Sequence, residues 1–387
     1  MYISRIAENI VKDKLSNKKV LMVLGARQVG KTTMVKRILQ GRNAVFFNFD
    51  AQVDLDRFKS LSAVSASEVM KSLGNPEIIV IDEAQRWAET ARVVKGWYDY
   101  EIKCKVILLG SSSLNILNQS SESLTGRNEK LYLPPLTFKE IVAAQDWYLP
   151  GQDFKQTALH FKAQVRELLM QNLIFGSYPE VVTSGNREEL LLNLVSDYLL
   201  KDILNLDLVK SQETIKRLLQ LLAHQAGSEV SVSELSLNLH TSRATVEKYL
   251  DLLEETYVIF RLPAFSTNPR KEIAKSRKIY FWDTGIRNAV LGEFSQSELR
   301  PDIGALWENW VVAEFAKHNL LSGKKSNLYF WRSRFSGEVD LVLKSGAELK
   351  AYEIKWQAQK IKKRAFEKAY NITVHLIESS NPFVDEF

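Results

Sequence analysis

The sequence predicts an α/β protein of several domains, and three observations lead to this prediction. Short apolar segments alternate with helical patterns over roughly the first 145 residues. A glycine-rich phosphate-binding loop joins the first of these segments to the helix that follows it. The chain of 387 residues is too long for one small hydrophobic core, so we expect two to four domains.

The apolar runs in the N-terminal part have the length of strands buried on both faces of a parallel sheet. They are residues 20–24, 44–49, 78–81 and 106–109. Helical patterns lie between them, so this part is expected to form a parallel α/β sheet. Two prolines in residues 133–136 interrupt the alternation and predict the exit from this domain.

A complete G-x-x-x-x-G-K-[ST] loop follows the first predicted strand and opens a predicted helix over residues 31–39. Its glycines let the backbone wrap a polyphosphate, and the N–H groups at the helix start point at the anion. We expect Lys31 to reach the β and γ phosphates of ATP and the Thr32 hydroxyl to bind Mg²⁺. The predicted nucleotide-binding residues are Gly25, Ala26, Arg27, Gln28, Val29, Gly30, Lys31, Thr32 and Thr33.

Two carboxylates end the third predicted strand. Asp82 is expected to hold Mg²⁺, as the equivalent aspartate does in P-loop NTPases, and Glu83 to polarise the attacking water as a general base. The alternative is that both residues only cap the next helix. Their position downstream of a complete phosphate loop favours catalysis.

Two weaker candidates accompany this site. A serine of residues 111–113, after the fourth strand, can sense the γ-phosphate or cap a helix. Arg127 is a candidate arginine finger, supplied in trans by a second copy of the chain, or an ordinary surface arginine.

The motifs GARQVGKTT, IIVIDEAQ, LLGSSS and LTGR, followed by LYLPPLTFKE, resemble those of the predicted AAA-type ATPases of bacteria and archaea. The resemblance continues through GSYPEVV, YLLKDIL, YFWDTGI, WENWVVAEF and GEVDLVL…YEIKW, and so covers nearly the whole chain. It implies a C-terminal domain of unknown function with a restriction-endonuclease-like core. Ala26 stands where family members commonly have proline.

A helix-turn-helix is predicted over residues 232–254, with Ser242 or Thr241 as the N-cap of the second helix and a wing strand over residues 256–262. The outward residues of the second helix would be Arg243, Glu247, Lys248 and Asp251. Such a winged helix can read DNA or dock a protein. The two acids weaken the case for DNA.

A hairpin with Gly346-Ala347 at its turn is predicted in the last third. The residue numbers of each pair across this hairpin then add up to 693, so Asp340 lies opposite Glu353. Both side chains share one face of the hairpin with Lys355. This spacing is that of PD-(D/E)xK nucleases. Asp340 and Glu353 could bind a second Mg²⁺ or Mn²⁺, with Lys355 nearby and Glu308 as a further acid. The alternative is an inactive core with a plain Glu338–Lys355 ion pair.

Composition excludes several classes of protein. No apolar stretch approaches the roughly 20 residues that cross a bilayer, and the single cysteine, Cys104, excludes an internal disulfide framework. We therefore expect a cytoplasmic protein without a membrane partner. Of the 52 basic and 46 acidic side chains, 20 and 15 lie in residues 263–387, where a basic run spans residues 360–364. If double-stranded DNA is a partner, this segment is the better place for it.

These observations predict four domains: an AAA-type ATPase core (1–145), a helical lid (146–207), a winged helix (208–262) and a restriction-endonuclease-like domain (263–387). The expected function is Mg²⁺-dependent ATP hydrolysis that controls a C-terminal domain interacting with DNA or protein. An ATP-regulated metal-dependent DNA nuclease and a nucleotide-switched binding protein with negligible turnover are the alternatives.

Overall fold

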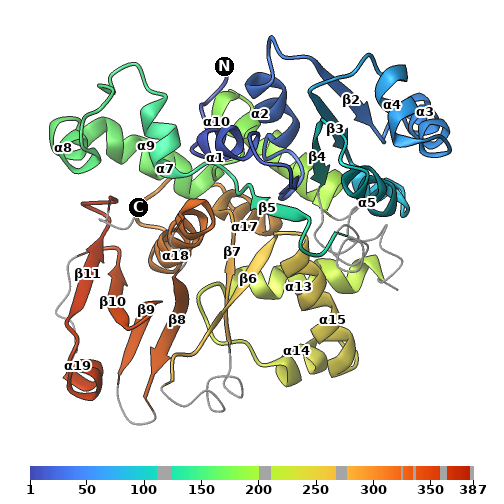
Figure 1. The fold of residues 1–387 in the computed structure, drawn as a ribbon. Helices are drawn as coiled ribbons and strands as arrows, with labels where there is room; N and C mark the ends of the chain where they lie inside the picture. Colours follow the sequence, from blue (N-terminus) through green and yellow to red (C-terminus); the bar gives the residue numbers. More distant parts are fainter. Residues whose placement is uncertain are drawn as a thin grey trace. The chain divides into compact units, whose positions relative to one another are not determined.

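A computed structural model describes residues 1–110, 124–199, 211–266, 277–323, 326–333, 337–357 and 364–383 (Figure 1). The chain divides into two compact units. One unit consists of residues 4–134, and the other consists of residues 1–3 together with residues 135–387. The unit of residues 4–134 therefore ends within residues 133–136, the proline-containing segment predicted to end the first domain. The finer division of the second unit into lid, winged helix and C-terminal domain stays a prediction.

The 4–134 unit is built on a five-stranded parallel sheet of order β2-β3-β4-β1-β5. β1, β3 and β4 are almost wholly buried, which is why their sequences are continuous apolar runs rather than alternating ones. The four strands predicted for this part are confirmed. The strands are β1 (Val20–Leu24), β2 (Ala44–Asn48), β3 (Ile78–Asp82), β4 (Lys105–Gly110) and β5 (Asn128–Tyr132).

Helices cover this sheet. The apolar cluster on one face joins Met22, Phe47 and Ile81 of the strands to Phe58 and Trp97 of α3 and α5. The described helices are α1 (Ala7–Lys14), α2 (Lys31–Ile38), α3 (Gln52–Ser62), α4 (Ala66–Ser72) and α5 (Thr90–Asp99), with a short 3₁₀ turn at Ala84–Arg86.

The second unit begins with helices. They are α7 (Phe138–Ala143), α8 (Phe154–His160), α9 (Lys162–Phe175), α10 (Pro179–Thr183), α11 (Arg187–Asn193), a π-helical segment (Leu194–Leu199), α13 (Gln212–His224), α14 (Val232–Asn238) and α15 (Arg243–Glu255). Ser242 caps α15 by accepting from the Thr245 N–H, and Val246, Leu250 and Leu253 are buried, as the sequence predicts.

Two sheets complete this unit. β6 (Ile259–Pro263) and β7 (Arg277–Phe281) form an antiparallel pair. β8 (Asn327–Arg332), β9 (Glu338–Ser345), β10 (Glu348–Lys355) and β11 (Val374–Glu378) form a mixed sheet of order β11-β10-β9-β8, in which only β10 and β11 are parallel. The remaining helices are α17 (Thr284–Leu291), α18 (Ile303–Leu321) and α19 (Arg364–Tyr370).

Two of the motifs that carry the family resemblance, GSYPEVV and YFWDTGI, meet at the buried carboxylate of Asp283. Asp283 caps α17 through the Ile286 N–H and also accepts from the backbone N–H and hydroxyl of Ser177. Lys317 of α18 donates to the same Ser177 hydroxyl at 2.9 Å. A Cβ atom at Gly176 would lie 1.9 Å from Asp283 Oδ1, so the close approach requires glycine there. These motifs therefore build the core of the second unit.

α18 is buried around most of its circumference and contacts several parts of the second unit. Asn309 exchanges two hydrogen bonds of 2.9 Å with the backbone of Phe281, and Trp310 Nε1 donates to Asn172 Oδ1 at 2.6 Å. Among the described residues, no helix combines the length and apolarity that a membrane span requires.

Candidate functional site

The phosphate loop follows β1 directly and leads into α2, the context that its motif requires. Gly30 has φ +91°, in the left-handed region that favours glycine, and Gln28 has φ +60°. A Cβ atom at Gly25 would lie 2.2 Å from the carbonyl oxygen of Leu133, so only glycine fits there. The loop thus has the tightly wound backbone that can surround a phosphate group.

Lys31 is buried at the start of α2, and its ammonium group lies over the loop. Lys31 Nζ donates to the carbonyl oxygens of Gly25 and Ala26 at 2.9 and 2.7 Å. The fixed positive charge therefore lies within the phosphate loop, where the first-turn N–H groups of α2 also favour an anion.

Thr32 lies in the first turn of α2, after β1, and Asp82 ends β3, yet their side chains meet. Thr32 Oγ1 donates to Asp82 Oδ2 at 2.6 Å, while Asp82 Oδ1 accepts from the Glu83 N–H at 3.0 Å. All strands of this sheet are parallel, so the carboxyl ends of β1 and β3 lie at one edge. A hydroxyl and a carboxylate at this edge are the oxygen donors that Mg²⁺ prefers.

Glu83 has φ +52° and ψ +41°, an unusual backbone conformation for a residue other than glycine. Its carboxylate accepts a hydrogen bond from Gln85 Nε2 at 2.5 Å. Strained backbone of this kind is found at functional sites, where neighbouring contacts hold it in place. Gln85 was not predicted as a site residue.

Arg5 supports the loop and was also not predicted. Its guanidinium donates to the carbonyl oxygens of Val29 at 2.8 Å and Pro134 at 2.7 Å, and the side chain is buried. Arg5 therefore connects the phosphate loop to the end of this unit. The sequence signal was slight, because Arg5 is one basic residue in a charged N-terminal segment and Pro134 is 129 residues away.

Arg127 is not brought to this site. It directly precedes β5, and its carbonyl accepts from the N–H of Val20, the first residue of β1. Arg127 thus lies at the amino end of the strands, opposite the phosphate loop. Its Nε donates to Asp99 Oδ1 at 2.7 Å. A role on phosphate would have to be exerted on another copy of the chain.

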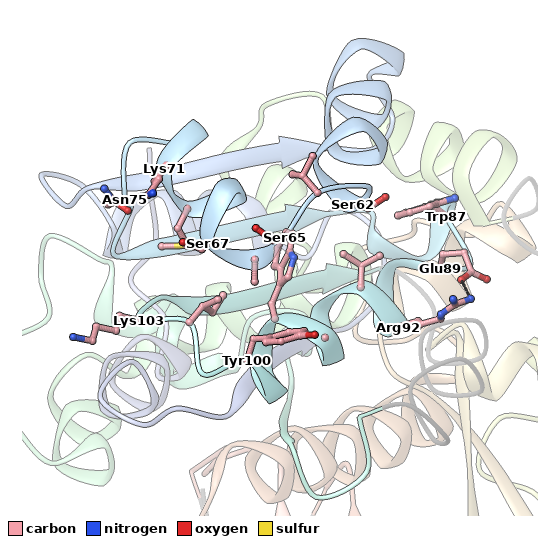
Figure 2. A pocket seen from close by; sticks show the side chains of 17 residues that line it. Ser62, Ser65, Ser67, Lys71, Asn75, Trp87, Glu89, Arg92, Tyr100 and Lys103 are labelled. Carbon is pink, nitrogen blue, oxygen red and sulfur yellow. Dashed lines mark hydrogen bonds and ion pairs between the residues drawn. The ribbon is translucent and has the colours of Figure 1, made fainter.

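A separate cavity of about 1080 Å³ opens on the same unit, and Figure 2 shows the side chains that line it. These belong to residues 62–75 and 87–103, including Trp87, Tyr100, Lys71 and Lys103. None of the lining residues belongs to the phosphate loop or to the end of β3. The cavity is therefore separate from the residues predicted to bind the nucleotide.

The C-terminal hairpin has the predicted register. Pairs from Glu348–Ser345 to Tyr352–Leu341 sum to 693, and Gly346 at the turn has φ +59°. Beyond these pairs, Asp340 Oδ2 accepts from the Ile354 N–H at 2.8 Å.

Asp340, Glu353 and Lys355 lie together, as predicted. Lys355 Nζ is 3.3 Å from Asp340 Oδ2 and 2.7 Å from Glu353 Oε1. The proposed Glu338–Lys355 ion pair is wrong. Glu338, the first residue of β9, instead pairs with Lys278 of β7 at 2.6 Å, and Lys355 is already held by two other carboxylates.

Glu308 of α18 joins the same cluster through residues of β7. Its Oε1 accepts from Lys278 Nζ at 3.1 Å and from the Tyr280 hydroxyl at 2.8 Å. Burial, followed by the charge of Asp340, raises the pKa of Glu308 to about 7. The same two causes raise the pKa of Glu353.

Lys278 is the residue of this cluster that sequence reasoning missed. Period-2 alternation in β7 places Lys278 and Tyr280 on one face, a weak signal beside the stronger hairpin pattern. Burial lowers the pKa of Lys278, but Glu308, Asp340 and Glu338 outweigh it, so the pKa is raised.

The predicted recognition helix α15 carries its acids against the following strand. Arg261 of β6 is 2.6 Å from Asp251 and 3.7 Å from Glu247, and its Nε donates to Glu254 at 2.7 Å. The negative charges on the outward surface of α15 are thus partly neutralised by Arg261 of the same unit. Residues 111–113 and 360–363 lie outside the part of the chain that the structure describes, as does the side chain of Arg364.

Comparison with protein families identifies the N-terminal part. Residues 17–142 match the model of a family described as "AAA domain". Over these residues the chain is therefore similar to AAA domains, which supports nucleotide binding and hydrolysis by this part of the chain. Residues 166–297 and 303–381 match two families described as domains of unknown function, DUF8612 and DUF4143. These two matches assign no activity, so the endonuclease-like interpretation of the C-terminal part stays a prediction.

Relatives extend over most of the chain. An uncharacterised protein of Mycobacterium tuberculosis is 29% identical over 344 residues, which are 87% of this chain and 70% of the relative. An uncharacterised protein of Methanocaldococcus jannaschii is 25% identical over 383 residues, covering 95% and 82%. The Walker-type ATPase of Pyrococcus abyssi is similar in fold, with a TM-score of 0.51 and 15% identity over 75% of this chain and 96% of that one.

Proposed function

We propose that this protein is a Mg²⁺-dependent ATPase whose ATP cycle changes the arrangement of its second unit on DNA or a protein partner. The observation that carries the proposal is the 2.6 Å contact between Thr32 and Asp82 beside a complete phosphate loop. The AAA-type domain accounts for nucleotide binding and hydrolysis in general terms, and the residue roles below are more specific.

The phosphates of ATP would bind to the loop backbone of residues 25–30 and to the ammonium group of Lys31. The glycine-only geometry at Gly25 and the left-handed Gly30 support this role, because both allow backbone N–H groups to approach an anion closely. Thr32 and Asp82 would hold Mg²⁺. When bound, the metal ion supplies positive charge that offsets charge developing on the phosphates.

Glu83 would orient the attacking water and accept its proton. Three features support this role: its position after Asp82, its αL backbone, and the hydrogen bond from Gln85 that holds its carboxylate. Arg127 would act only from a neighbouring copy, since it lies at the opposite end of its own sheet.

Phosphate release by the wild type and by Lys31→Ala, with and without double-stranded DNA, tests this function. We expect Mg²⁺-dependent release by the wild type and its loss in the variant. Stimulation by DNA would support coupling to the second unit through a DNA partner. Equally slow release by wild type, Lys31→Ala and Glu83→Gln would contradict the enzymatic function.

A further inference from the structure

The cluster at the junction of β7, α18 and the β9–β10 hairpin is held together by ion pairs to two lysines. Two ammonium groups face four carboxylates, those of Glu308, Glu338, Asp340 and Glu353. Lys355 contacts the last two carboxylates and Lys278 contacts the first two. Each carboxylate therefore already has a cationic partner within the protein.

Lys278 is placed at the inner side of this cluster. Its side chain is only 4% exposed, and its Nζ lies 3.1 Å from Glu308, 2.6 Å from Glu338 and 5.6 Å from the ring centre of Phe330. The raised pKa of Lys278 includes a contribution from Asp340. The ammonium group thus occupies Glu308, the further acid of the predicted metal site, and Glu338 beside it, while Asp340 lies near enough to act on its charge.

Room for a metal ion is correspondingly restricted. Mg²⁺ needs carboxylate oxygens at about 2.0–2.1 Å in an octahedral arrangement, but Glu308 Oε1 is already shared between Lys278 and the Tyr280 hydroxyl. A Cβ atom at Gly227 would lie 3.2 Å from the same oxygen, so the backbone is close on that side. Among the described residues, no group of three or more His, Cys, Asp or Glu side chains is arranged to hold a metal.

We propose that the ammonium group of Lys278 takes the place of a divalent cation in this cluster, so that the acids of the C-terminal hairpin form a metal-independent ion-pair core. A divalent ion bound to Glu308 or Asp340 would bring two like charges close together in a buried site, which is unfavourable. The proposal is independent of the ATPase function, and it replaces the alternative of a metal-dependent nuclease.

Binding of Mn²⁺ without nucleotide tests the proposal, with the number of bound ions per chain measured by electron paramagnetic resonance. Any ion at the ATPase site contributes equally to all variants. We expect wild type and Asp340→Asn to bind the same number of Mn²⁺ ions. We expect Lys278→Met to bind one ion more, and Lys278→Met/Asp340→Asn to lose that additional ion.

Several results would overturn the proposal. One is a lower Mn²⁺ stoichiometry, or an affinity at least tenfold weaker, in Asp340→Asn than in wild type. Another is a folded Lys278→Met protein that binds no additional ion. Mn²⁺-dependent cleavage of DNA by wild type that is lost in Asp340→Asn would also overturn it.

Lys278→Met leaves Glu308 and Glu338 without their counter-ion, and circular dichroism shows whether the variant folds. If it folds only when Mn²⁺ is added, the metal has replaced the ammonium group, as proposed. If it does not fold at all, wild type and Asp340→Asn, which both keep Lys278, still test the proposal. Equal Mn²⁺ binding by the two proteins supports it, and weaker binding by Asp340→Asn overturns it.

Discussion

The hydroxyl of Thr32 donates a 2.6 Å hydrogen bond to the carboxylate of Asp82, although β4 lies between β1, which leads into the loop before Thr32, and β3, which ends at Asp82. The contact spans the carboxyl edge of the parallel sheet and brings together the two parts of the predicted Mg²⁺ site. Five predictions test this site and the rest of the fold.

Asp82→Asn should reduce the rate of phosphate release by about 100-fold, because it removes the charge that holds Mg²⁺ while keeping the size of the side chain. Raising the Mg²⁺ concentration should restore part of the activity. Steady-state phosphate release over a Mg²⁺ titration measures both effects. Asp56→Asn is a matched control and should retain wild-type activity, since Asp56 is exposed on α3 and its carboxylate contacts Gln52 and Lys59 of the same helix.

Glu83→Gln should bind ATP as tightly as wild type and hydrolyse it at least about 100-fold more slowly, since the amide cannot accept a proton from water. Glu83→Gly should be equally inactive but more stable by about 1 kcal/mol, because glycine adopts φ +52° without strain. Nucleotide binding, single-turnover hydrolysis and chemical denaturation measure the three quantities. A Gly variant less stable than wild type would show that this backbone conformation stores no strain.

Gly25→Ala should abolish nucleotide binding, because the new Cβ would lie 2.2 Å from the Leu133 carbonyl oxygen and neither backbone can easily move. Gly96→Ala is the matched control. It lies within α5 with nothing within 4 Å of the added atom, and it should stabilise the protein by about 0.5–1 kcal/mol. Binding of a fluorescent nucleotide and thermal denaturation compare the Gly25→Ala and Gly96→Ala variants. Normal binding by Gly25→Ala would refute the packing argument.

Arg5→Ala should weaken ATP binding about tenfold with a smaller effect on kcat, because it releases the Val29 carbonyl that shapes the loop. Arg5→Lys should restore binding only in part, since an ammonium group cannot reproduce the fork that reaches Val29 and Pro134 together. Arg92→Ala, at an exposed position of α5, is the control. Equal losses in KM and kcat for both Arg5 variants would indicate general damage to the fold.

Stability should depend on pH through Glu308. Its pKa is raised to about 7 in the folded protein, so the folded state holds a proton that the unfolded state releases near its ordinary value. This contribution to stability is present at low pH and is lost as the pH rises toward about 7, with a slope of at most about 1.4 kcal/mol per pH unit. The Glu308→Gln variant has no carboxyl group at this position, so its free energy of unfolding does not fall in this way as the pH rises.

The free energy of unfolding of Glu308→Gln relative to wild type should therefore increase between about pH 5 and pH 7 and level off above that range. Urea denaturation at several pH values measures the difference, in which the other titrating groups cancel. A difference that does not change with pH would show that Glu308 is ionised throughout.

Much of the fold follows from local sequence patterns. The strands of the first unit are predictable because burial on both faces makes them continuous apolar runs, and the phosphate loop because its spacing is strict. The hairpin register followed from one turn glycine, Gly346, because pairing in a hairpin is set by its turn. These features depend on residues close together in the chain.

Two of the residues that were missed act over long distances in the sequence. Lys278 meets Glu308 of α18 and Glu338 of another sheet, and Arg5 reaches Val29 and Pro134. Each is a single charged side chain without a motif. Only the folded arrangement shows that its partner is a carbonyl of the phosphate loop or a carboxylate of a predicted metal site.

The burial of α18 has a consequence for how the C-terminal part can be isolated. A fragment cut at the family boundary, before residue 303, would begin with α18. This helix carries four buried residues: Trp307, Asn309, Trp310 and Lys317. In the whole unit, Asn309, Trp310 and Lys317 are bonded to segments before residue 303, and Phe138 packs against the ring of Trp310. A fragment of residues 303–381 would expose the indole ring of Trp310 and strip buried polar groups of their partners. We expect it to aggregate, whereas a fragment beginning near residue 135 retains every one of these contacts.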